Sequence, residues 1–279
     1  MRTRMFWIGF GVGTHVLFVL TVARLFPFLA GWLWPEGGFL ARAGLGPGLD
    51  WRAADVLLAL QFGLSHSVLL YPATRKRLQA WVPSPQYGCF FCGASCLSLL
   101  LTVEAWRPSP GLVWRLEGPA ASAVTAAFYL SWVGLFYSLW LTGLGYQTGF
   151  TPWWAWVRGR PAPRREFSEK GAYAKFRHPV YLSFLGLVWF TPVMSYDRAA
   201  LVAVWTAYIF VGSHLKDRRL IHYLGATYRE YQSRVPGYPL VPFGPLGKVP
   251  LRLEAEAEPR PPVGRRAGKP LRVGELIHR

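Results

Sequence analysis

Acidic residues and cysteines are both scarce in this chain of 279 residues. Asp and Glu number 14 against 31 Lys and Arg, so the formal net charge is +17 at pH 7. The three cysteines, Cys89, Cys92 and Cys96, fall in one apolar run without a second pair of ligands, which argues against a disulfide framework and a zinc site. The six histidines have no ligand spacing backed by carboxylates or thiols. We therefore expect no metal site and interpret the cysteines as membrane-buried small residues.

The basic excess does not by itself indicate a nucleic-acid-binding protein. Hydrophobic residues make up 52% of the chain, and no basic patch is interleaved with soluble-domain sequence. High apolarity together with high charge is typical of a protein whose apolar part faces lipid and whose charge lies in loops. We expect a lipid bilayer as partner and no nucleic acid.

Six apolar stretches are candidates to cross the hydrocarbon core, a distance of ~30 Å that takes about 20 helical residues. The first follows a basic start, as in a signal peptide, but it is long and lacks a small-residue cleavage site, which predicts a retained span. The last two are separated by residues 194–198 and predict a tight helical hairpin, with Pro192 kinking its first arm. The predicted fold is all-α: a polytopic membrane protein with about six transmembrane helices. The stretches are 6–34, 54–71, 86–105, 119–146, 180–196 and 198–215.

Loop charge predicts the orientation of these spans. The loops at 35–53 and 104–118 each balance two basic residues against two acidic ones, whereas the segments 72–85, 147–178 and 216–279 carry a basic excess. Six spans with both termini in the cytoplasm place every basic loop inside. We expect one membrane domain over 1–249 and a basic, flexible cytosolic tail over 250–279.

Polar residues gather where the predicted hairpin leaves the membrane. Arg177 and His178 begin its first arm, where an anion would meet both a cation and free backbone amides. The return arm ends near Asp217, and the chain continues through an amphipathic helix that contains Tyr228. We expect these four side chains to converge on one pocket at the inner interface.

Other polar and aromatic residues permit two interpretations. Tyr181 and Tyr231 suit either an interfacial aromatic belt or a ligand contact. His66 lies between two serines inside a predicted span, where polar groups are expensive. Its role is either helix–helix hydrogen bonding or the lining of a substrate cavity.

The order of these motifs resembles the isoprenylcysteine carboxyl methyltransferase type of integral membrane methyltransferases, and most closely its branch with nurim and methanethiol S-methyltransferase. The resemblance covers most of the chain, with core motifs over 157–243. It implies a membrane methyltransferase that uses S-adenosylmethionine, bound at the cytosolic end of the last hairpin, and it favours a bacterial inner membrane. The matching segments are 64–68, 106–108, 113–114, 157–161, 177–182, 189–194, 206–209 and 225–236.

The resemblance also implies roles for single residues. Arg177 and His178 fall where the family lines its cofactor pocket, and Arg177 would pair with the carboxylate of the methionyl group. Tyrosines downstream would wall the adenosine, and the acceptor would enter from the bilayer between spans. The implied cofactor-binding residues are Arg177, His178, Tyr181, Asp217, Tyr228 and Tyr231, with Arg177 and Asp217 as catalytic candidates and His66 and Gln147 on the substrate side.

Two functions follow from this resemblance. One is methyl transfer to a small or apolar thiol by in-line displacement, which rests on proximity and exclusion of water around a thiolate. The other is a non-catalytic, nurim-like structural or accessory membrane protein with a degenerate cofactor site. The second is motivated by Lys216–Asp217, which stand where the family has two glutamates, and by the loop 143–152, which lacks the family's His and acidic residues.

Overall fold

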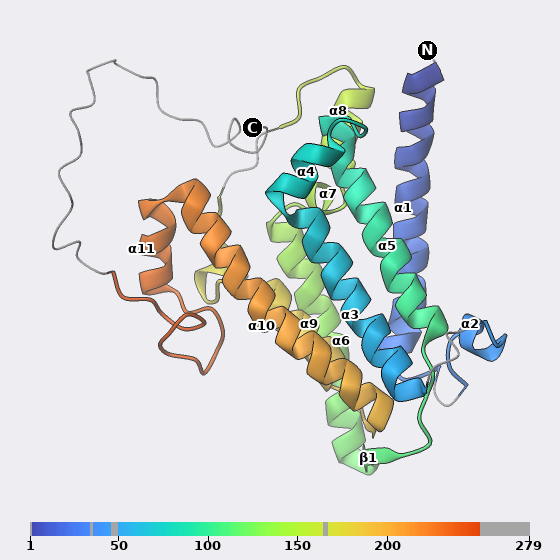
Figure 1. Cartoon of the computed structure of the whole chain (residues 1–279). Coiled ribbons are helices and arrows are strands. Elements are labelled where there is room, and N and C mark those ends of the chain that lie inside the picture. The colour runs from blue at the N-terminus through green and yellow to red at the C-terminus, as the bar shows by residue number, and fades with distance from the viewer. Residues whose placement is uncertain (1, 34–35, 46–49, 164–166, 252–279) are drawn as a thin grey trace. The chain divides into compact units, whose positions relative to one another are not determined.

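The computed structural model describes residues 2–33, 36–45, 50–163 and 167–251 (Figure 1). The chain forms two compact units. Met1–Pro163 and Val180–Ile209 make the first, and Arg164–Pro179 and Phe210–Arg279 make the second. The residues expected as one membrane domain, 1–249, divide between these units. The expected tail lies, from residue 252 onward, outside the described residues.

Most of the described residues lie in helices. Among the described residues, five helices are long and apolar enough to cross a membrane. The predicted all-α, polytopic membrane fold is therefore confirmed, and the chain is an integral membrane protein. Five of the six expected spans are long helices, and the one expected over 180–196 is a shorter apolar helix. The long helices are α1 (Arg2–Leu29), α3 (Trp51–Leu70), α5 (Tyr87–Ala105), α6 (Gly118–Leu141) and α10 (Tyr196–Leu224).

Short elements connect these helices within the first unit. Strands β1 (Leu112–Arg115) and β2 (Val193–Ser195) pair antiparallel, with Leu112 opposite Ser195. The strands and α2 lie at one end of the unit, while α4, α7 and α8 lie at the other (Figure 1). The remaining elements of this unit are α2 (Phe39–Arg42), α4 (Pro72–Leu78), η1 (Ser84–Gln86), α7 (Leu144–Gln147), α8 (Phe150–Val157) and most of α9 (Pro179–Trp189).

Helix α9 is shorter than the span expected over 180–196. Its 11 residues end at Trp189, three residues before Pro192. Proline lacks a backbone N–H and disfavours helical geometry in the residue before it, so the helix ends and the chain becomes β2. The expected kink is therefore a helix end. Eleven residues rise about 17 Å, well short of the ~30 Å core.

Helix α10 is longer than the span expected over 198–215. It runs for 29 residues, from Tyr196 through the polar residues near Asp217 to Leu224. The amphipathic helix expected to contain Tyr228 begins only after Gly225, which has a positive φ of 58°. A residue without a Cβ adopts this conformation readily, and its N–H donates to the Ile221 carbonyl at 2.8 Å, which closes the helix. Helix α11 (Ala226–Arg234) then begins in a new direction.

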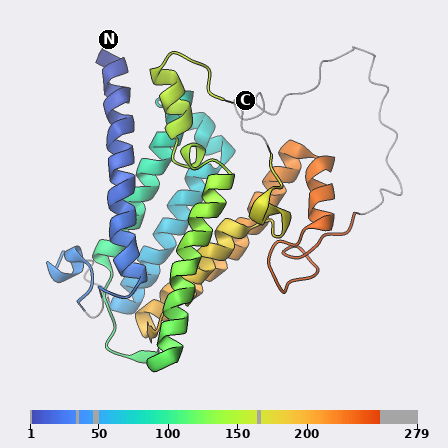
Figure 2. The same cartoon turned by 180° about the vertical axis from the view of Figure 1, so that it is seen from behind.

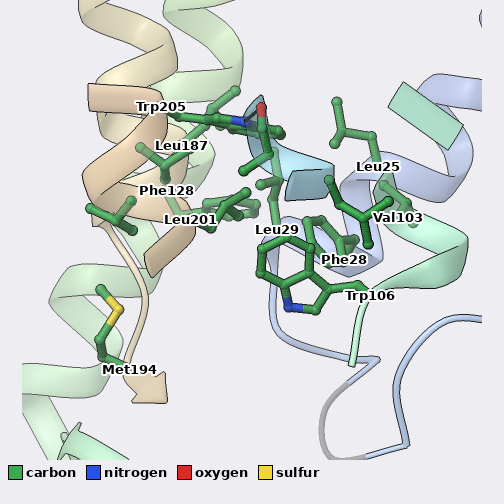
Figure 3. Close-up of a cluster of buried hydrophobic side chains, with 14 of the residues drawn as sticks. Leu25, Phe28, Leu29, Val103, Trp106, Phe128, Leu187, Met194, Leu201 and Trp205 are labelled. Atoms are coloured by element: carbon green, nitrogen blue, oxygen red, sulfur yellow. Dashed lines mark hydrogen bonds between the residues drawn. The ribbon is translucent and has the colours of Figure 1, made fainter. Parts of the chain in front are cut away.

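One hydrophobic cluster joins the helices of the first unit. Phe28 of α1 meets Trp106, just after α5, edge to face, with ring centroids 5.7 Å apart. Figure 3 shows this pair beside Leu29 and Val103. Seen from behind, α6 lies in front (Figure 2), and its Trp132 packs 5.5 Å from Phe26 of α1. Close packing of such aromatic rings stabilises this core.

A buried carboxylate fixes the end of this cluster. Asp197, at the start of α10, accepts hydrogen bonds from the Trp106 indole at 2.9 Å and from the backbone N–H of Ser109 at 3.0 Å. The Ser109 hydroxyl donates to it at 2.8 Å. The carboxylate therefore ties the chain after α5 to the first turn of α10. The cysteines lie buried in α5 as free thiols, as expected.

Replacing Gly225 tests the break between α10 and α11. Gly225→Ala should destabilise the protein by about 1–3 kcal/mol, because a Cβ strains a positive-φ residue even though nothing lies within 4 Å of it. Thermal unfolding in detergent measures this. Gly9→Ala is the matched control, since Gly9 lies inside α1 with open space around it and should gain up to about 1 kcal/mol. Equal midpoints for wild type and Gly225→Ala would contradict the assignment.

Candidate functional site

The second unit contains a buried ion pair. The Arg177 guanidinium donates to the Asp217 carboxylate from Nη2 at 2.9 Å and from Nε at 3.2 Å. The two residues are 1% and 2% exposed. Arg177 lies just before α9 and Asp217 in the last third of α10, so the pair joins the two ends of the predicted hairpin.

The same guanidinium holds the C-terminal segment 235–249. It donates to four backbone carbonyls in and next to this segment, and the backbone N–H of Arg177 donates to Pro236 O at 2.9 Å. All three guanidinium nitrogens are thus engaged inside the chain. The acceptors are Val235 (2.7 Å), Gly247 (2.6 Å), Pro245 (3.1 Å) and Gln232 (3.4 Å).

Asp217 has partners besides the arginine. The Tyr228 hydroxyl donates to Oδ1 at 2.5 Å, and His178 Nε2 lies 3.2 Å from Oδ2. His178 is fully buried and packs its ring 5.4 Å from that of Tyr238. The two oxygens of Asp217 therefore organise three side chains, two of them consecutive in the sequence and the third in α11.

Burial sets the protonation of the neutral members of this cluster. Burial lowers the pKa of His178, and the positive charges of Lys216 and Arg177 lower it further, whereas Asp217 acts in the opposite direction. The imidazole is therefore neutral at pH 7. Burial and then the Asp217 charge raise the pKa of the Tyr228 phenol. The phenol is therefore held as a hydrogen-bond donor to the carboxylate.

An aromatic cluster lies next to this polar network. The rings of Tyr228 and Tyr231 are 5.6 Å apart, and Phe167 meets both edge to face at 5.7 and 5.3 Å. Both tyrosines are 1% exposed. The Tyr231 hydroxyl donates to the Tyr173 carbonyl at 2.5 Å, so this cluster ties α11 to the segment before Arg177.

These contacts bring Arg177, His178, Asp217 and Tyr228 together, as expected, while a pocket at the inner interface stays a prediction. Their binding of a cofactor stays a prediction, as it does for Tyr231. Tyr181, also predicted for this site, is half-buried in α9 within the first unit. No group of three or more His, Cys, Asp or Glu that could hold a metal ion occurs in the part of the chain described.

The residues predicted to face the substrate both belong to the first unit. Gln147 is exposed at the end of α7. His66 in α3 has Nδ1 3.2 Å from the hydroxyl of Ser95 in α5, and the neighbouring Ser65 contacts Ser98 at 2.8 Å. Of the two interpretations of the polar triplet, helix–helix hydrogen bonding is what these contacts provide.

The role of the C-terminal segment 235–249 was not predicted from the sequence. This segment meets Arg177 through backbone carbonyls, which every residue has, so no side-chain pattern announces the contact. The one available signal is glycine: a Cβ on Gly237 would lie 2.4 Å from Leu246 O and 3.1 Å from the His178 ring. Only glycine fits this close approach.

The chain is similar to several curated membrane proteins. It is 31% identical over 237 residues to methanethiol S-methyltransferase 1 of Bradyrhizobium diazoefficiens, covering 81% of this chain and 79% of the relative. It is 29% identical to methanethiol S-methyltransferase of Pseudomonas sp. (strain GM41(2012)), covering 79% and 85%. Nurim of Pan troglodytes is 28% identical, with 79% and 88% covered. No protein-family model and no solved structure matches the chain.

Removing the guanidinium should destabilise the second unit strongly. Arg177→Met leaves Asp217 buried without its cation and frees four carbonyls, which should cost about 3–5 kcal/mol. Thermal unfolding in detergent measures the loss. Arg234→Met is the matched control, because its ion pair with Glu169 (3.0 Å) is exposed and contributes about 0–1 kcal/mol. Similar midpoints for the two variants would refute a structural role for Arg177.

Acidification should weaken the second unit through His178. Above pH 6.5, its ordinary pKa, the imidazole is neutral in the folded and unfolded chain. Between pH 6.5 and the lower pKa of the folded state, the imidazole binds a proton in the unfolded chain but not in the folded chain. The free energy of unfolding therefore decreases as the pH is lowered through this range. Unfolding midpoints between pH 7 and 5 should therefore fall less steeply for His178→Gln than for wild type. His222→Gln, at an exposed position outside this network, is the control variant.

Proposed function

The chain belongs to the family of integral membrane proteins that contains the methanethiol S-methyltransferases and nurim, and from this premise we propose that it methylates a small or apolar thiol. One observation carries the proposal. Similarity to proteins named methanethiol S-methyltransferase extends over about four-fifths of both chains. Such coverage extends far beyond one short motif and includes the ends of the helical hairpin.

We propose S-adenosylmethionine as the methyl donor, held in the second unit. When bound, it would supply a methyl group on a positively charged sulfur. The residues present fit such a group: the Arg177–Asp217 pair adds no net positive charge, and the tyrosine rings provide electron-rich faces that favour a cation. His178, neutral by burial, adds no positive charge at neutral pH.

Arg177 acts on this site by positioning, in our proposal. Its three nitrogens already donate to Asp217 and to backbone carbonyls. Direct pairing with the donor's carboxylate, as the resemblance implies, would require one of these bonds to be exchanged. Holding the C-terminal segment 235–249 against the end of α10 requires no exchange. Arg177 thereby orients the backbone that would border the donor.

The thiol acceptor demands little from the side chains. A thiol with a pKa near 8.5 is already partly ionised at neutral pH, so a general base is not essential. The enzyme's contribution is alignment of the thiolate with the methyl group and exclusion of water. We propose that the acceptor comes from the bilayer past His66 and Gln147.

We also propose that the chain lies in a bacterial inner membrane with both termini in the cytoplasm.

A non-catalytic, accessory role is the second candidate, and the nurim relatives motivate it. Their identities of 25% and 28% lie below the 31% and 29% of the two methanethiol S-methyltransferases compared above. Lys216 was the main residue in favour of a degenerate site. Its ammonium lies over the Tyr173 ring, whereas the buried network contains the Arg177–Asp217 ion pair. Methyl transfer is therefore the better-supported function.

Binding and turnover test the proposal directly. Protein purified in detergent should bind radiolabelled S-adenosylmethionine saturably and transfer label to methanethiol, measured as a volatile labelled thioether. Asp217→Asn should weaken donor binding by about tenfold, the loss of one charge-assisted contact. The matched control is Asp50→Asn, an exposed helix cap in the first unit. No saturable binding by the wild type up to millimolar donor would refute the proposal and favour the accessory role.

A further inference from the structure

Lys216 and Asp217 are neighbours in α10 that serve different parts of the second unit. Successive residues of an α-helix point about 100° apart, so one side chain can enter a buried network while the next leaves it. Asp217 enters the network with Arg177. Lys216 places its Nζ 5.7 Å from the centroid of the Tyr173 ring. This distance is within the range of a cation–π contact.

Tyr173 is the anchor of the short segment that leads into Arg177. It lies in η2 (Gly171–Ala174) and is 7% exposed. Its carbonyl accepts the Tyr231 hydroxyl at 2.5 Å from α11, while its ring receives the ammonium of Lys216 from α10. Backbone and side chain of one residue thus connect to two helices.

The segment's other fixed point is Arg177 itself, bonded to Asp217. Two consecutive residues of α10 therefore hold the segment at two places four residues apart. A shift of Tyr173 would move Arg177 and His178, and with them the carbonyls that Arg177 holds. The Lys216–Tyr173 contact is thus mechanically coupled to the proposed donor site.

We propose that Lys216 and Tyr173 form a brace that positions residues 171–178 for binding of the methyl donor. They are positioning residues of the transfer, and this inference rests on the proposed function. The brace also fixes where the charge lies, because the contact with the aromatic face holds the Lys216 ammonium against Tyr173.

Donor affinity in brace variants tests the proposal. Lys216→Met should raise the dissociation constant for labelled S-adenosylmethionine by about two- to fivefold, the factor that corresponds to a modest cation–π contact. Tyr173→Leu should do the same, since the carbonyl that accepts Tyr231 is retained. In kinetics the effect should fall on the KM for the donor, with kcat and the KM for the thiol little changed. Lys216→Arg and Tyr173→Phe, which keep a cation and an aromatic ring, should bind the donor with nearly the wild-type affinity.

Two controls separate the brace from a general effect of lost charge or lost packing. Lys175→Met removes the same charge from an exposed position of the same segment and should leave affinity near that of wild type. The double variant Lys216→Met/Tyr173→Leu should bind no more weakly than either single variant, because both break one contact.

Each contrary result has a distinct meaning. Full additivity in the double variant, or unchanged affinity in Lys216→Met, would overturn the brace. Tighter donor binding in Lys216→Met would overturn it as well, because the ammonium would then face the donor and repel it. Wild-type protein that fails to bind the donor would instead refute the proposed function.

Discussion

The second unit depends on one buried ion pair. Removing a guanidinium and a carboxylate from water is expensive, and it is compensated only when the remaining donors and acceptors are also satisfied. Here Arg177 and Asp217 meet that condition through backbone carbonyls, the Tyr228 hydroxyl and His178. The pair therefore requires α10, α11 and the C-terminal segment 235–249 to be in place at the same time. Such mutual dependence gives a polar site one defined geometry.

Proline and glycine residues determine where the helices that carry this site begin and end. Pro192 stops α9 after 11 residues, while α10 continues for 29 and brings Asp217 well beyond its apolar first half. Gly225 then turns the chain so that α11 presents Tyr228 and Tyr231 to the same cluster. A symmetric hairpin with equal arms would end its return arm before residue 217. The unequal arms therefore allow Asp217 to lie beyond the apolar part of α10.

Much of the fold and part of the site follow from local sequence. Apolar runs longer than about 18 residues predict spans because no other structure satisfies backbone hydrogen bonds in lipid. The convergence of Arg177, His178, Asp217 and Tyr228 could be predicted because a helical hairpin returns its ends to one side. The lengths of α9 and α10 could not, since hydropathy does not register where a proline or glycine ends a helix. The orientation of Lys216 could not be predicted either, because it depends on how the helix is rotated about its axis and on Tyr173, which lies 43 residues away in the sequence.

By itself the sequence determined that this is an all-α membrane protein, and the order of its motifs placed it among membrane methyltransferases. These conclusions rest on hydropathy, loop charge and the identity of side chains, which are properties of each residue or its near neighbours. Only the tertiary structure decided that Arg177 is enclosed by carbonyls of residues 232–247 and that Lys216 is directed to Tyr173. Backbone carbonyls are the same in every residue, so their partners are selected by packing and not by sequence pattern.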